Sequence, residues 1–145
     1  MKIKNLYFSP VKSLSFNNVD NLEIIKNIGI KNDRIFAFTN NLNLKDIELI
    51  KNNPLKREIY KFLSLKKYPE LNQYNFLLED NFLILEFENN IILKTDIDNQ
   101  HEVKILCNKL EDILPNINNI NLLKDNMNPF FDTMPNKSIS LINLN

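Results

Sequence analysis

Three short apolar runs between residues 74 and 96 restrict the fold of this chain more than any other feature. The runs YNFLLED, FLILEFE and NIILKTD follow one another, with the turn signals Asp80-Asn81 and Asn89-Asn90 between them. Aromatic and β-branched runs joined by two polar turn residues are typical of antiparallel hairpins. The sequence therefore predicts a three-stranded antiparallel meander in the second half of the chain.

Asparagine takes the place of glycine as the turn residue. About a fifth of the residues are Asn, whereas Gly29 is the single glycine. Asn adopts the left-handed backbone conformation more readily than most residues that have a Cβ atom. We therefore expect turns at the five Asn-Asn pairs, which occupy residues 17–18, 40–41, 52–53, 89–90 and 118–119.

The other predicted elements are short strands and two helices. Strands are predicted at residues 3–8, 22–25, 34–39, 120–123 and 138–143. Helical spacing of apolar residues predicts helices at 44–52 and 101–114, which Pro54 and Pro115 end. Residues 56–65 fit either a helical turn or a strand. The predicted class is α+β and mainly antiparallel, with a barrel-like sheet and two or three helices.

Composition and charge exclude several classes of protein. The 145 residues suit about one domain, and 18 basic residues balance 18 acidic ones. Proteins that bind nucleic acid or anionic lipid usually carry an excess of basic residues, and this chain has no such excess. The start lacks the apolar stretch of a secretory signal, and no run reaches the roughly 20 apolar residues that span a bilayer. We expect a cytoplasmic protein without nucleic-acid or membrane partners.

The common catalytic and metal-binding templates are missing. A single glycine rules out a glycine-rich phosphate loop, and one His with one Cys rules out a Cys/His zinc cage. His101 is expected to face solvent at a helix start, and Cys107 to be a small, partly buried helix residue rather than a nucleophile. Glu86 and Glu88 alternate with apolar residues, as on the solvated face of a strand.

Two motifs remain that place polar side chains where strands meet turns. SPVKS contributes Lys12 and Ser13, and GIKNDR contributes Arg34. If the two strands pair, an ammonium, a hydroxyl and a guanidinium converge and can hold a phosphate or a polar heterocycle. The alternative is a local ion pair between Asp33 and Arg34 beside an exposed Lys12, which contributes little to stability.

The same two motifs carry a resemblance to a known family. The stretch YFSPVKSLSFNNVDNLEIIKNIGIKNDRIFAFTN resembles the start of the MOSC amino-terminal β-barrel domain. In that family, Tyr-Pro-Val/Ile-Lys-Ser/Gly is followed by a Gly-Leu/Ile turn and Asp-Arg before an aromatic strand. FLSLKKYPELNQYNF and FFDTMPNKSISLIN resemble later segments, so the likeness spans nearly the whole chain. It implies a MOSC amino-terminal domain at residues 1–125 and, at 126–145, a linker and the first strand of a truncated MOSC domain.

The resemblance implies a function in binding the molybdenum cofactor, a molybdenum ion held by molybdopterin. Family members include oxidoreductases that reduce N-oxygenated small molecules with electrons from a redox partner protein. In them, residues that match Lys12, Ser13 and Arg34 contact the pterin. The molybdenum-ligating cysteine lies in the carboxy-terminal domain, and Cys107 does not match it. We therefore expect a fragment that is inactive alone.

The sequence departs from the family pattern at one position and leaves two other functions open. Phe16 stands near a position where many members have Gly or Pro, a difference that bears on the path of the loop after Ser13. A non-catalytic binding module is one alternative function. A carrier of sulfurated or pterin ligands is another.

Overall fold

The computed structural model describes residues 3–57 and 62–131, which form two α-helices, two described 3-10 helices and nine short strands. The helices are α1 (Leu44–Asn52), η1 (Pro54–Lys56), η3 (Pro69–Gln73) and α2 (Gln100–Ile113). The strands are β1 (Leu6–Phe8), β2 (Asn17–Val19), β3 (Ile24–Ile25), β4 (Gly29–Ile30), β5 (Phe36–Thr39), β6 (Tyr74–Glu79), β7 (Phe82–Phe87), β8 (Asn90–Asp96) and β9 (Asn121–Lys124). The predicted strand at 138–143 lies outside the described residues.

The predicted meander is confirmed. Strands β6, β7 and β8 form one antiparallel sheet, in which Tyr74 lies opposite Phe87 and Phe82 opposite Asp96. The second turn consists of Glu88 and Asn89, with φ of 50° and 62°, one residue earlier than predicted. Positive φ at both central residues matches the right-handed twist of the two strands.

Asparagine makes many of the tight turns, as predicted. Six of the ten described non-glycine residues with positive φ are Asn: 27, 32, 41, 89, 116 and 119. Three of the five Asn-Asn pairs supply one of them each. The pair at 17–18 lies in β2 instead, and the pair at 52–53 ends α1.

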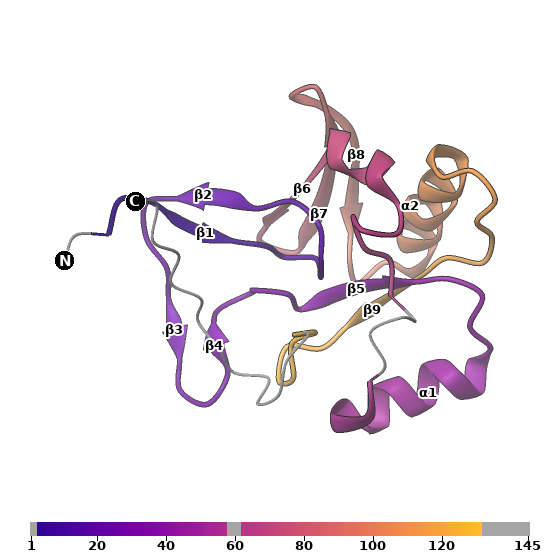
Figure 1. Ribbon diagram of the computed structural model, residues 1–145, viewed down its shortest axis with the longest axis horizontal. Coiled ribbons are helices and arrows are strands. Elements are labelled where there is room, and N and C mark those ends of the chain that lie inside the picture. Colours follow the sequence, from indigo (N-terminus) through magenta and orange to yellow (C-terminus); the bar gives the residue numbers. More distant parts are fainter. Residues whose placement is uncertain (1–2, 58–61, 132–145) are drawn as a thin grey trace.

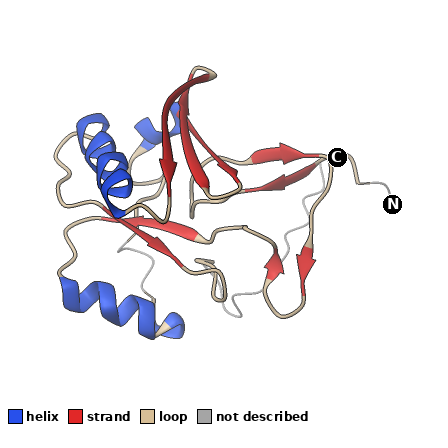
Figure 2. Ribbon diagram, turned by 180° about the vertical axis from the view of Figure 1, so that it is seen from behind, coloured by secondary structure: helices blue, strands red, loops and turns tan. Residues whose placement is uncertain are grey.

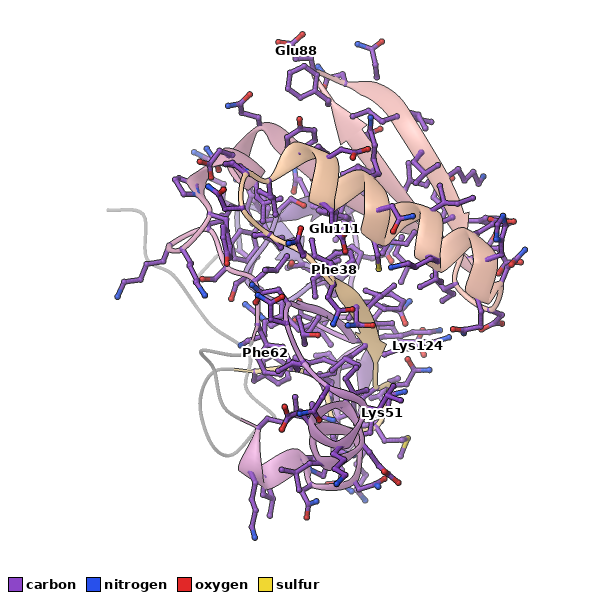
Figure 3. The ribbon with its side chains drawn as sticks, turned by 90° about the vertical axis from the view of Figure 1, so that its right-hand side faces the viewer. Phe38, Lys51, Phe62, Glu88, Glu111 and Lys124 are labelled. Atoms are coloured by element: carbon purple, nitrogen blue, oxygen red, sulfur yellow. The ribbon has the colours of Figure 1, made fainter. Side chains whose placement is uncertain are left out.

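A two-stranded antiparallel sheet, β5 with β9, crosses the middle of the molecule (Figure 1). All four residues of β5 are buried, so both of its faces pack against apolar side chains. Phe36 and Phe38 lie in the main core with side chains of β6, β7 and α2, whereas Ala37 lies in a second cluster with Ile50 and Phe62. This alternation is the period of two that a strand dictates. Figure 3 shows Phe38 and Phe62 in the interior.

The helices cover opposite sides of this central pair (Figure 2). α2 contacts β8 and β9 and buries Leu106, Cys107 and Leu110 in the main core. The side chain of Asn99 caps its start by accepting the backbone N–H groups of His101 and Glu102. α1 has the predicted bounds, and α2 begins and ends one residue earlier than predicted.

The described strand pairs fall into four small sheets, β1 with β2, β3 with β4, β5 with β9, and β6 to β8, all antiparallel. The predicted α+β, mainly antiparallel class is therefore confirmed. Strands β2 and β4 were not predicted, and the strand predicted at 22–25 shortens to β3. Within 56–65, Lys56 ends η1 and Phe62 forms an isolated bridge with Thr39.

Candidate functional site

The first motif forms a tight turn directly after β1. The buried Ser9 hydroxyl donates to the Val11 carbonyl oxygen at 2.6 Å and lies 3.2 Å from that of Leu14. Val11 and Leu14 are themselves fully buried and anchor the turn in the main core. Ser13 lies between these anchors with a φ of 58°, in the left-handed region. The turn thus holds Lys12 and Ser13 in fixed positions.

The second motif is built around the buried carboxylate of Asp33. This carboxylate accepts the Ser9 backbone N–H at 2.9 Å and pairs with Nη1 of Arg34 at 2.5 Å. Burial raises the pKa of Asp33 above its usual value, and the Ser9 N–H and the Arg34 guanidinium oppose that rise. Arg34 also has a positive φ, of 53°. Asp33 therefore joins the two motifs directly.

The two motifs run side by side, although the strands next to them, β1 and β5, pair with β2 and β9 and not with each other as the prediction required. Val11 and Phe36 form a parallel bridge. The Lys12 N–H donates to the Phe36 carbonyl oxygen at 2.8 Å, and the Arg34 N–H donates to that of Ser9 at 2.6 Å. The backbone thereby places Lys12 beside Phe36 and Arg34 beside Ser9, while Ser13 follows further along the first motif.

The side chains of both cations lie against the same dipeptide, Phe130-Phe131. Lys12 is 3% exposed, and its ammonium donates to the Phe130 carbonyl oxygen at 3.2 Å and lies 5.6 Å from the centre of the Phe62 ring. The Arg34 guanidinium carbon lies 5.2 Å from the centre of the Phe131 ring. The expected alternative of an exposed Lys12 is therefore wrong, whereas its companion, the Asp33–Arg34 ion pair, is present.

A third cation, Arg57, joins this region and was missed from the sequence. Its Nη2 pairs with Asp125 at 2.5 Å, and Nη1 donates to the Asn128 carbonyl oxygen at 2.5 Å. Its guanidinium carbon lies 4.2 Å from the centre of the Phe130 ring. No spacing rule links an Arg after η1 to an Asp beyond β9, so no sequence signal marked this pair.

The other residues considered from the sequence lie on α2, on β7 and in the turn after β7. His101 is exposed in the first turn of α2. Cys107 is buried, and burial raises the pKa of its thiol to about 11, so it is protonated at neutral pH. Glu86 is partly exposed and lies beside Asn75, at a shallow groove of about 420 Å³ that Glu88 also lines. In the described part of the chain, no three His, Cys, Asp or Glu side chains could together hold a metal ion.

In comparisons with known proteins, no family model, no curated protein and no solved structure matches this chain. Neither described α-helix has the length and apolar character that a membrane-spanning helix requires. The assignment of function therefore depends on the residues of the site themselves.

Proposed function

We propose that this chain is the amino-terminal domain of a MOSC-type protein and that Lys12, Ser13 and Arg34 hold polar groups of a molybdenum cofactor. The observation that carries the proposal is the parallel pairing of the two motifs at Val11 and Phe36. The family resemblance rests on these two motifs. They are adjacent in the structure, although β2, β3 and β4 separate them in sequence.

The backbone at these residues supports the same assignment. Ser13 and Arg34 both have positive φ, although neither is Gly, Asn or Asp. Such conformations cost on the order of 1–3 kcal/mol each and are concentrated at binding and active sites. Most of the other described residues with positive φ are Asn, which adopts this conformation at lower cost. An Arg and a Ser at these two places therefore favour a role for their side chains.

The three side chains fit the anionic and polar edges of a pterin cofactor in the type of donor that they offer. A guanidinium binds a phosphate through two parallel hydrogen bonds, and an ammonium and a hydroxyl add single donors. The Arg34 side chain is 26% exposed, so its guanidinium is partly open to solvent. When bound, the cofactor supplies the oxygen-atom and electron-transfer chemistry, while these residues orient it and balance its charge.

The wider assignment is part of the same proposal. A barrel-like arrangement is supported by contacts between the separate sheets: Val11 joins the first motif to β5, and the side chains of Ser15 and Asn17 bond the backbone of Phe76 in β6. We place the domain at 1–125 and a linker with the first MOSC strand at 126–145. The whole protein would be cytoplasmic and reduce N-oxygenated small molecules with a redox partner.

Pterin capture during expression tests this proposal. The chain is produced in a host that makes the molybdenum cofactor, and the bound pterin is oxidised and measured by fluorescence per mole of protein. Arg34→Ala should lower bound pterin by about tenfold or more, because a lost charge-assisted hydrogen bond costs about 1.5–3 kcal/mol. Lys31→Ala is the matched control, because Lys31 forms an exposed ion pair with Glu23.

Each outcome separates the proposal from its alternatives. Pterin bound by the wild type and the control but lost in Arg34→Ala and Lys12→Ala supports the cofactor site. Pterin levels that are equal in all four proteins would indicate a binding module for another ligand. Retention of pterin by this chain, combined with a complete protein that never turns over N-oxygenated compounds, would indicate a carrier.

A further inference from the structure

The loop of residues 125–131, which we call the 125–131 loop, contacts both motifs of the proposed site. Its Phe130 accepts a hydrogen bond from the Lys12 ammonium through its carbonyl oxygen and donates its backbone N–H to the Arg34 carbonyl oxygen at 2.8 Å. Phe131 lies against the Arg34 guanidinium. The loop therefore covers the same two residues that would hold the cofactor.

Arg57 holds this loop in place. Besides its bonds to Asp125 and to the Asn128 carbonyl oxygen, its Nε donates to the Ile50 carbonyl oxygen at 3.1 Å. The guanidinium thus links the end of α1 to both ends of the loop's first turn and stacks on the Phe130 ring. The Arg57 side chain is 8% exposed, so loss of its charged partner would leave a buried guanidinium unpaired, which is costly.

The internal structure of the loop makes it a unit. One Asp125 carboxylate oxygen accepts the backbone N–H groups of Met127 and Asn128 at 3.0 and 2.8 Å, while the other pairs with Arg57. The Asp125 N–H donates to the Ile35 carbonyl oxygen. The turn and its attachment therefore depend on the two oxygens of one carboxylate.

From these contacts we infer that the 125–131 loop is a lid over the Lys12 ammonium, with the Arg57–Asp125 pair as its latch. An anionic group that approaches from the side of the loop reaches the Lys12 ammonium when Phe130, whose buried ring packs edge-on against Phe62, moves away, so binding of the phosphate-bearing cofactor is coupled to opening of the loop. This inference rests on the proposed function for the identity of the ligand. That the loop covers Lys12 is inferred from two observations: the burial of Lys12 and the hydrogen bond from its ammonium to the Phe130 carbonyl oxygen.

The first test measures access to Lys12 directly in the full chain. Reductive methylation is followed by peptide mass spectrometry in the wild type, in Asp125→Asn and in Glu23→Gln. Asp125→Asn keeps an oxygen for the turn but removes the charge that pairs with Arg57. Methylation of Lys12 should be about tenfold faster in Asp125→Asn, the population shift expected from loss of one charge-assisted hydrogen bond. Glu23→Gln removes a carboxylate from an exposed pair and should leave the Lys12 rate unchanged.

A second measurement needs no variant and uses inorganic pyrophosphate as the probe. Hydrogen exchange of the Phe130 amide should accelerate several-fold at saturating pyrophosphate, because the open loop no longer donates this N–H to Arg34. Unchanged exchange at saturation, or equal Lys12 methylation in wild type and a folded Asp125→Asn, overturns the lid. If pyrophosphate binds none of the proteins, the proposed anion site fails, and the methylation rates alone still decide whether the loop covers Lys12.

Discussion

The buried carboxylate of Asp33 should make the protein more stable as the pH falls, which is the reverse of an ordinary ion-paired Asp. Burial raises the pKa of this carboxyl above the value of 3.8 that it has in an unfolded chain. The folded state then binds the proton more tightly than the unfolded state. Between the folded pKa and 3.8, the free energy of unfolding therefore rises as the pH is lowered, and it loses this contribution as the pH rises again.

Replacement of Asp33 by Asn isolates this effect. The amide oxygen of Asn can still accept a hydrogen bond from the Ser9 N–H, so the hydrogen bond that connects the two motifs is kept. At pH 7 the variant loses the charged bond to Arg34 but also the cost of a buried charge, and we expect a net change of about 1 kcal/mol or less. The difference between wild type and variant should then grow in favour of the wild type at lower pH, by ~1.4 kcal/mol for every tenfold rise in proton affinity on folding.

Urea unfolding of both proteins between pH 7 and pH 3, in steps, gives this difference directly. All other acids are common to the two proteins and cancel in the subtraction. If the stability of the wild type falls relative to Asp33→Asn as the pH is lowered, the carboxyl has a depressed pKa in the folded state. That result would refute a dominant effect of burial, because the Arg34 guanidinium and the Ser9 N–H would then outweigh it.

Two further predictions concern the turns and the single thiol. Asn89 has a φ of 62° in the β7–β8 turn, so Asn89→Ala should lower stability by about 1 kcal/mol and Asn89→Gly should not, as measured by thermal unfolding. Equal melting temperatures for Ala and Gly would contradict a requirement for the left-handed conformation. Burial raises the pKa of Cys107 to about 11, so the folded protein at pH 8 should react with a disulfide reagent far more slowly than the protein in urea. Immediate stoichiometric reaction of the folded protein would show that the thiol is accessible.

Local patterns predicted the elements that depend on local chemistry. The meander and α2 were found because apolar periodicity, Asn turns and a terminal proline act over a few residues. β2 and β4 were missed because strands of two or three residues are too short to show a period. β2 also contains Asn17, whose side chain bonds the Phe76 carbonyl oxygen of β6, a contact that no turn rule anticipates.

The sequence marked the candidate residues but gave no information about their surroundings. Lys12 and Arg34 stood out as cations where strands meet turns, and the backbone does bring them together. Their partners, Phe130 and Phe131, lie near the other end of the described chain in a segment without periodicity. The burial of Lys12 follows from that distant segment, so the sequence around Lys12 could not reveal it.

The pairing of β5 with β9 also has a consequence for how the protein is made. Phe36 of β5 pairs with Lys124 of β9, so the central sheet cannot form until most of the chain has left the ribosome. Until then, Phe36 and Phe38 belong to an exposed apolar segment without its partner strand. Long-range strand pairing of this kind folds slowly and leaves nascent chains prone to aggregation. During synthesis, the segment that carries Arg34 therefore stays without its partner strand until residues 121–124 have been made.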